Sequence, residues 1–180
     1  GQSKLVSTFR SAHRPNHMGV DYAAPRGTKV FAVADGEIVR SKTGCPQEGK
    51  LGSSCGGGFG NNVYIKHDKK TPAGEDIFSV YAHLSKVMVE SGRVTAGQPI
   101  GTVGNTGSSA GNHLHLEIHI GKLFGQRVDP LAYLSNLDAV ADTGQEPHEE
   151  HTRYGWEDPP GVEGVDYVWT DQKKGLYREI

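Results

Sequence analysis

The segment His113-Leu-His-Leu-Glu-Ile-His-Ile120 alternates strictly between polar and apolar side chains. Because successive side chains of a β-strand point to opposite faces, the polar side chains share one face and the leucine and isoleucine side chains share the other. The polar face comprises His113, His115, Glu117 and His119. Histidines two positions apart on a strand lie roughly 6–7 Å apart, close enough to serve one site. A solvated polar face with incidental histidines explains the pattern equally well.

Five further segments have the composition of strands and are bounded by Gly, Pro, Asn or Asp, as expected of antiparallel strands joined by turns. They cover residues 29–34, 36–40, 62–67, 78–83 and 98–103. Helical patterns are scarce, and one turn of helix or a bend is expected at residues 87–93. Glycine accounts for 25 of the 180 residues, about twice its usual share of roughly 7%. The sequence therefore predicts an all-β fold of antiparallel sheets.

Charge divides the chain near residue 137. Residues 1–137 contain 15 basic and 10 acidic residues, a net charge of +5, whereas residues 138–180 contain 4 and 11, a net charge of −7. The second stretch is polar and punctuated by proline, and only residues 165–170 have the pattern of a short strand or docking segment. We therefore predict one folded domain over residues 1–137 and a mostly irregular acidic extension over residues 138–180.

Composition disfavours several classes of protein. No arginine-rich run or aromatic stacking pattern indicates nucleic-acid binding. No apolar run approaches the roughly 18 residues of a membrane-spanning helix. The chain begins with Gly1, and no apolar signal-peptide segment follows, so we expect a fragment of a longer protein.

Cys45 and Cys55 flank a glycine- and serine-rich segment typical of a loop between two strands. A bridge between them would stabilise the fold by roughly 2–3 kcal/mol and imply an oxidising compartment. Two free or metal-binding thiols are the alternative, which the absence of a C-x-x-C spacing or a second cysteine pair disfavours.

A second group of metal-binding residue types lies in His17-Met-Gly-Val-Asp21. Imidazole and carboxylate together form a common partial ligand set for zinc, and Gly19 favours a bend over a helix between them. A helix joining His13 to His17 is opposed by Pro15, so His13 is left out of the site.

Adding His115 to His17 and Asp21 gives two imidazoles and one carboxylate. That is the ligand count that leaves one position of a tetrahedral zinc ion open, as in catalytic sites. His113 and His83 then become candidates for proton transfer and for stabilising the charge that develops on a carbonyl oxygen.

Together with the order of the surrounding blocks, these motifs resemble the lysostaphin-type (LytM-like) zinc metallopeptidases, which are peptidoglycan endopeptidases. The resemblance extends over residues 7–134 and includes His17-Met-Gly-Val-Asp21, Tyr81-Ala-His-Leu84 and His113-Leu-His115. The remaining blocks are residues 22–30, 34–39, 60–65, 94–107 and 128–131. Several blocks in consistent order are far more specific than one histidine pair.

The resemblance implies an antiparallel β fold with a substrate groove, and one Zn²⁺ ion held by His17, Asp21 and His115. It places His83 and His113 on the two catalytic histidines that do not bind metal, without deciding which is the general base. The implied activity is bacteriolytic hydrolysis of an amide bond in the stem or cross-bridge of cell-wall peptidoglycan, with residues 1–137 as the catalytic domain. The bond itself stays open.

Two alternatives accompany this interpretation. Some relatives have lost ligands and act as non-catalytic regulators of other wall hydrolases, although all five site residues are present here. The same peptidase also suits a wall-penetrating domain of a phage particle. The expected location is accordingly extracellular, periplasmic or in the cell wall, or in a phage particle.

The other titratable residues are given lesser roles. Glu117 is interpreted as an ordinary surface carboxylate in preference to a partner that orients His115. His67 and His119 are interpreted as structural or incidental. His148 and His151, in the acidic extension, are expected to be free.

Overall fold

The computed structural model describes residues 3–134, 167–171 and 176–179. The described chain is almost entirely β, apart from the 3-10 turn η1 (Cys55–Gly58) and a helical turn at residues 130–134. The strands are β1 (Lys4–Ser7), β2 (Val20–Ala23), β3 (Lys29–Phe31), β4 (Gly36–Lys42), β5 (Asn61–His67), β6 (Ile77–Leu84), β7 (Lys86–Val87), β8 (Gly92–Val94), β9 (Pro99–Thr102), β10 (His113–Ile120), β11 (Gln126–Val128), β12 (Tyr167–Asp171) and β13 (Leu176–Glu179).

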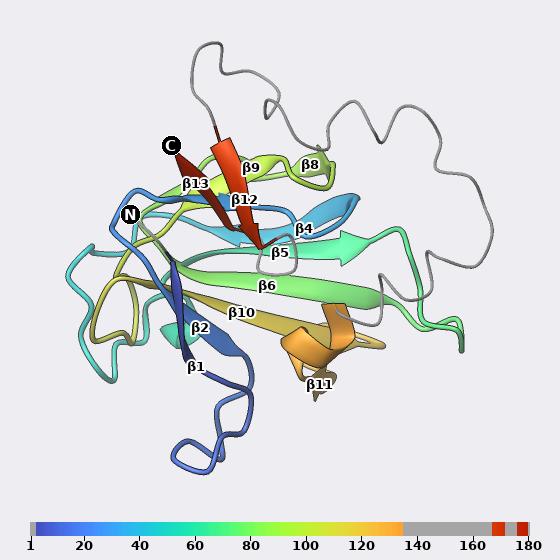
Figure 1. Cartoon of the computed structure of the whole chain (residues 1–180), viewed down its shortest axis with the longest axis horizontal. Helices are drawn as coiled ribbons and strands as arrows, with labels where there is room; N and C mark the ends of the chain where they lie inside the picture. Colours follow the sequence, from blue (N-terminus) through green and yellow to red (C-terminus); the bar gives the residue numbers. More distant parts are fainter. Residues whose placement is uncertain (1–2, 135–166, 172–175, 180) are drawn as a thin grey trace.

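The strands form two antiparallel sheets. The larger sheet has the order β1-β2-β10-β6-β5-β4-β8, with β11 also paired to β10, and the smaller has the order β12-β13-β3-β9-β7. Figure 1 shows β10, β6, β5 and β4 side by side across the molecule, with β9, β12 and β13 along one edge of the view. The predicted all-β antiparallel fold is confirmed.

All six predicted strands are present, with ends that differ by up to three residues. Residues 87–93 form the bend and not the helical turn, because β7 and β8 lie at its two ends. Five strands of the first 134 residues were not predicted, namely β1, β2, β7, β8 and β11. Each has two to four residues, too few to display a clear period of two.

The hydrophobic core lies between the two sheets. Leu114 and Leu116 of β10 are fully buried and belong to one cluster with Val30 of β3 and Ile100 of β9. This is the apolar face that the alternation of β10 predicts. The opposite face of the larger sheet is therefore left to carry polar side chains.

The described part of the acidic extension is the pair β12 and β13. Strand β13 pairs with β3 through Leu176 and Val30, which adds two strands to the smaller sheet. Residues 165–166 of the predicted strand segment lie outside the described residues, as do His148 and His151.

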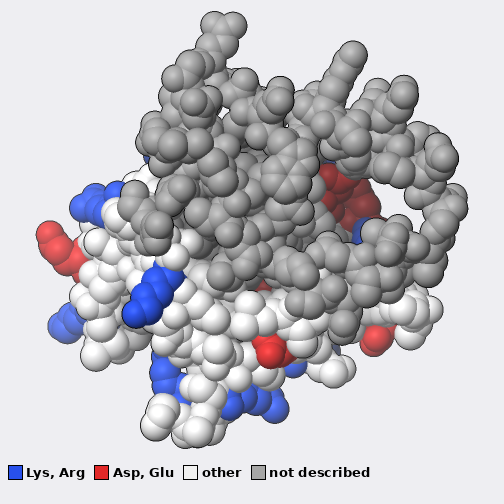
Figure 2. All heavy atoms as spheres, viewed as in Figure 1, with Lys and Arg blue, Asp and Glu red and all other residues white. Residues whose placement is uncertain are grey.

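Within the described residues, no helix has the length and apolar character needed to cross a membrane. Figure 2 shows lysine and arginine side chains scattered among acidic and uncharged residues on the described surface visible in that view.

Candidate metal centre

The pairing of β2 with β10 brings the predicted ligands together. Asp21 lies directly opposite His115 in the register of the two strands, so both side chains project from the same face. His17 precedes β2 in a bend that passes close to β10. A Cβ atom on Gly19 would lie 2.3 Å from the carbonyl oxygen of Leu116 and 2.9 Å from the His115 ring, so only glycine permits this approach.

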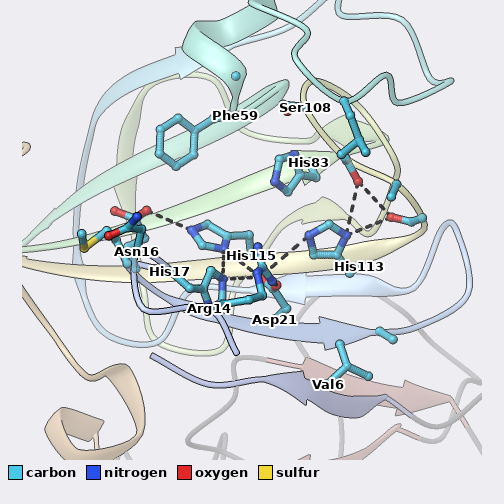
Figure 3. A pocket seen from close by; sticks show the side chains of 18 of the residues that line it. Val6, Arg14, Asn16, His17, Asp21, Phe59, His83, Ser108, His113 and His115 are labelled. Carbon is cyan, nitrogen blue, oxygen red and sulfur yellow. Dashed lines mark hydrogen bonds and ion pairs between the residues drawn. The ribbon is translucent and has the colours of Figure 1, made fainter. Parts of the chain in front are cut away.

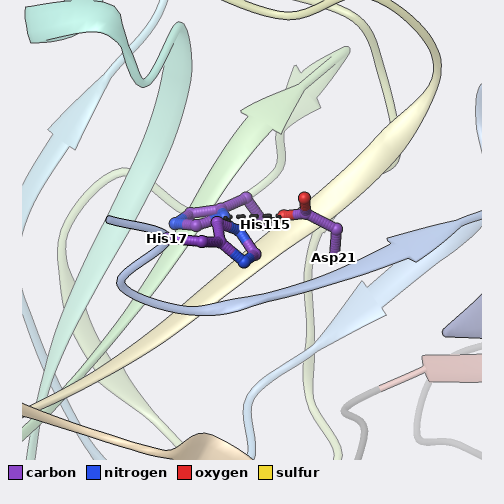
Figure 4. A group of neighbouring side chains, drawn as sticks. All are labelled: His17, Asp21 and His115. Carbon is purple, nitrogen blue, oxygen red and sulfur yellow. Dashed lines mark hydrogen bonds and ion pairs between the residues drawn. The ribbon is translucent and has the colours of Figure 1, made fainter. Parts of the chain in front are cut away.

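Three donor atoms converge at this point (Figure 4). His17 Nε2 lies 3.0 Å from Asp21 Oδ1 and 3.1 Å from His115 Nδ1, and His115 Nδ1 lies 2.7 Å from Asp21 Oδ1. Metal–ligand bonds of 2.0–2.2 Å in a tetrahedral zinc site give ligand separations of about 3.3 Å. The triangle therefore has nearly the size that a zinc ion requires.

The second nitrogen of each ring bonds an oxygen that fixes the tautomer. His17 Nδ1 donates to the carbonyl oxygen of Thr8 at 3.0 Å, and His115 Nε2 donates to Glu117 Oε1 at 2.9 Å. The nitrogens that face Asp21 are then the lone-pair nitrogens of the two rings. In the neutral rings, two nitrogen lone pairs and a carboxylate oxygen directed at one point repel one another unless a metal ion or a proton on a ring nitrogen lies between them, so the donor set fits a metal ion.

Charge around the centre also favours a cation. Burial opposes ionisation of Asp21, but hydrogen bonds with His115 and His17 hold its pKa well below the usual range. The other oxygen, Oδ2, accepts a hydrogen bond from Arg14 Nη1 at 2.5 Å. Burial of His115 favours its neutral form, yet hydrogen bonds with Asp21 and Glu117 raise its pKa to about 9. Without a metal ion, a proton on His115 Nδ1 thus supplies the positive charge that a bound cation would otherwise bring to this position.

Glu117 is not a surface carboxylate, so that interpretation was wrong. It is 3% exposed and bonds His115 through Oε1 and His119 through Oε2. Burial alone would raise its pKa, but these two hydrogen bonds lower it to about 2. The polar face of β10 is likewise mostly buried: His115 is 7% exposed, and His119 is fully buried and bonded to the β10–β11 turn, whereas His113 is only partly buried.

His83 reaches the site because the backbone of β6 is irregular. Tyr81 belongs to the core, and strict alternation would place His83 beside it on the core face. A β-bulge sets two residues of β6, Ala82 and His83, against one of β5, Asn62, and His83 has a φ of 61°, in the left-handed region. Its ring therefore turns to the opposite face, with its centroid 4.7 Å from that of His113 (Figure 3).

Both of these histidines present Nε2 as a proton acceptor. His83 Nδ1 donates to the carbonyl oxygen of Thr106 at 2.8 Å, and His113 Nδ1 donates to that of Gly111 at 2.9 Å. Burial lowers the pKa of His83 to about 4, with a further contribution from neighbouring His113. Burial also lowers the pKa of His113. Both rings are therefore neutral near pH 7 and able to take up a proton.

A pocket of about 930 Å³ opens over these groups and corresponds to the predicted groove. Its lining includes all five predicted site residues and Phe59 (Figure 3), and also Leu51. The latter two belong to the loop that follows β4, in which Cys45 and Cys55 form a disulfide. The loop supplies one wall of the pocket, and Phe59 lies 6.0 Å from His115 between ring centroids.

The groups that hold the site residues in place were mostly not predicted. The carbonyl oxygens of Thr8, Thr106 and Gly111 fix three ring orientations, and a backbone oxygen leaves no signature in a sequence. Arg14 also has no distinguishing spacing. Glu117 did have a signal, because the alternation of β10 places it on the same face as His115.

Comparison with known proteins agrees with this geometry. The sequence profile of Peptidase family M23 matches residues 15–130. DD-carboxypeptidase/endopeptidase Mpg of Neisseria meningitidis is 41% identical over 116 residues, which is 64% of this chain and 22% of the relative. Murein hydrolase activator NlpD of Escherichia coli is 34% identical over 134 residues, 74% of this chain and 30% of the relative. The chain thus spans under a third of either protein.

Solved structures give the same result. The catalytic domain of the antimicrobial peptidase lysostaphin from Staphylococcus simulans superposes with a TM-score of 0.57 at 29% identity, covering 74% of this chain and 92% of that domain. Since the profile match covers well over half of the residues and includes every predicted site residue, the chain belongs to peptidase family M23.

Proposed function

We propose that this protein is a zinc-dependent endopeptidase that hydrolyses peptide bonds in the stem or cross-bridge of bacterial peptidoglycan, outside the cytoplasm. The observation that carries the proposal is the convergence of three metal-binding atoms beside two neutral histidines in one pocket. Every one of these groups lies within residues 1–137, which we propose as the catalytic domain.

Zinc would be held by His17 Nε2, Asp21 Oδ1 and His115 Nδ1. When bound, the ion supplies Lewis acidity. Arg14 supports this ligand set by donating a hydrogen bond to the second oxygen of Asp21, which orients the carboxylate. Glu117 orients the His115 ring by accepting a hydrogen bond from its Nε2 atom. These residues prepare the centre and take no part in proton transfer.

His83 and His113 would perform the proton transfer. Each ring is neutral and directs Nε2 away from the backbone oxygen that holds Nδ1. A ring in this state accepts a proton from the attacking water and, as an imidazolium, donates it to the leaving amine. The Nε2 atom of His113 lies 3.8 Å from Asp21 Oδ1, so this ring adjoins the metal centre directly.

The proposal is tested by comparing the intact chain with His115→Ala and with the control His67→Gln. His67 is another buried histidine of the larger sheet, but it bonds Asp35 and Ser79 and not the site. We expect about one zinc per chain in the wild type and the control, and fragments released from purified peptidoglycan by both. His115→Ala should lack both properties, and equal hydrolysis by all three proteins would refute the proposal.

A non-catalytic role has one specific observation in its favour, the similarity to NlpD. The complete set of five site residues favours the peptidase. Mass spectrometry of the released fragments distinguishes the two and also identifies the bond. A protein that releases nothing alone, yet increases fragment release by a second wall hydrolase, would be an activator.

A further inference from the structure

A chain of hydrogen bonds runs behind the candidate metal centre to the turn between β10 and β11. Glu117 accepts hydrogen bonds from His115 Nε2 at 2.9 Å and from His119 Nε2 at 2.6 Å, one on each carboxylate oxygen. His119 Nδ1 accepts a hydrogen bond from the backbone N–H of Phe124 at 3.1 Å. The chain thus links a proposed metal ligand to a surface turn.

The backbone N–H of Phe124 and the ionised carboxylate of Glu117 together fix the direction of every bond in this chain. A backbone N–H can only donate, so His119 Nδ1 must be an acceptor and a neutral His119 must carry its proton on Nε2. Glu117 then accepts from His119 with one oxygen and from His115 with the other. His115 consequently carries a proton on Nε2, which leaves Nδ1 as the nitrogen that faces Asp21.

The turn is held in an unusual conformation that aims this N–H. Phe124 has a φ of 60°, which is uncommon for a non-glycine residue and persists only where the surroundings fix it. Its ring packs against those of His119 and Tyr64, and the guanidinium groups of Arg40 and Arg127 lie over it.

We propose that His119 is a positioning residue that, through Glu117, sets the tautomer and orientation of His115 and thereby the zinc affinity of the centre. The inference rests on the proposed zinc site. His119 itself is fully buried and is absent from the pocket lining, so it contacts neither metal nor substrate.

His67 provides a matched control for a purely structural histidine. It is also buried in the larger sheet and has both ring nitrogens bonded, to the backbone oxygen of Asp35 and to Ser79 Oγ. Neither partner bonds a site residue. Replacing His67 should therefore cost stability without altering the metal centre.

The experiment measures zinc affinity by competition with a chromophoric chelator, and the visible spectrum of the cobalt-substituted protein, for the wild type and three variants. Partners that orient metal ligands change metal affinity by about 10- to 100-fold when they are removed. We expect His119→Phe, which keeps a ring but loses both bonds, to weaken zinc binding about tenfold and to shift the cobalt spectrum. His67→Phe should leave both unchanged.

The variant His119→Gln should restore near-normal affinity, because its amide can accept from Phe124 and donate to Glu117. Wild-type affinity in His119→Phe, or equal losses in His119→Phe and His67→Phe, would overturn the inference while leaving the zinc site intact. If His119→Phe does not fold, Glu117→Gln replaces it, with the same expected loss and the same contrary outcome. A wild type that fails to bind zinc would overturn this inference and the proposed function together.

Discussion

His113 and His119 lie at the two ends of β10, on the same face, and each has one ring nitrogen bonded to the backbone. At His113 the backbone group is the carbonyl of Gly111, so Nδ1 donates and Nε2 is left for the pocket. At His119 it is the N–H of Phe124, so Nδ1 accepts and Nε2 donates to Glu117. The same residue type in one alternating strand is thus an available base at one end and a fully bonded support at the other.

The coverings of the two ends differ as well. The disulfide loop and residues 108–112 form walls around the His113 end of β10, here called the outer end, and leave a pocket between them. The β10–β11 turn closes over the other end, here called the inner end, where His119 is fully buried. The comparison shows that the backbone partner and the access of solvent decide what each histidine can do.

The largest expected effect comes from removing the available bases. We expect His113→Gln and His83→Gln each to lower kcat by about 10²- to 10⁴-fold, the usual contribution of a general acid–base group. Zinc content should stay near one per chain, since neither side chain belongs to the ligand triangle. Fragment release from peptidoglycan and metal analysis check this together. Full activity in both variants would remove the distinction between the two ends of β10.

The wall of the outer end should depend on its disulfide. Replacing Cys45 and Cys55 together by serine removes a cross-link that restricts the unfolded chain. The unfolded chain gains conformational entropy, so the free energy of unfolding should fall by about 3 kcal/mol. Urea denaturation with and without reductant measures the change. The double variant should also lose its sensitivity to reductant, whereas a reductant effect that persists would point to another cause.

Low pH should destabilise the fold through His83. Burial holds its pKa at about 4 in the folded protein, against roughly 6.5 in the unfolded chain. The unfolded chain therefore binds the proton first, and stability that is fully present above about pH 6.5 is lost as the pH falls toward 4. Between pH 6.5 and 5 the loss is about 2 kcal/mol.

Urea unfolding of the chelator-treated protein at several pH values tests this expectation. His67 and His113 also have lowered pKa values and contribute with the same sign. The contribution of His83 is isolated by subtracting the pH dependence of His83→Gln. A variant with an equally steep dependence would show that His83 is already solvated in the folded protein.

The smallest effect is expected from removing the acidic extension. The described part of residues 138–180 pairs with β3 in the smaller sheet, whereas the site lies on the larger sheet. A chain ending at Leu137 should therefore bind zinc and hydrolyse peptidoglycan like the full chain, at low and high salt alike. Faster hydrolysis by the shortened chain at low salt would instead indicate inhibition by the acidic extension, whose net charge is −7.

Much of this site could be predicted because several of its residues lie on one strand, β10, whose side chains alternate between the two faces. The alternation in β10 places His113, His115 and Glu117 on one face without reference to any other segment. The bend at Gly19 was also foreseeable, since glycine between His17 and Asp21 disfavours a helix. The error at Glu117 arose because alternation assigns a face but not whether that face is covered.

The sequence alone thus determined the alternating strand, the antiparallel β class and the residue types of the metal centre, because these depend on local geometry that repeats every two residues. Tertiary structure alone decided that Asp21 lies opposite His115, since the register of two strands depends on contacts between segments that are distant in the sequence. It also turned the His83 ring away from the core face, where strict alternation would place it, through a bulge and a left-handed backbone conformation that the local sequence does not predict. Finally, it supplied the backbone carbonyl and N–H groups that select one nitrogen on the rings of His17, His83, His113 and His119. Almost every residue carries such groups, so the sequence does not indicate which of them will bond a histidine.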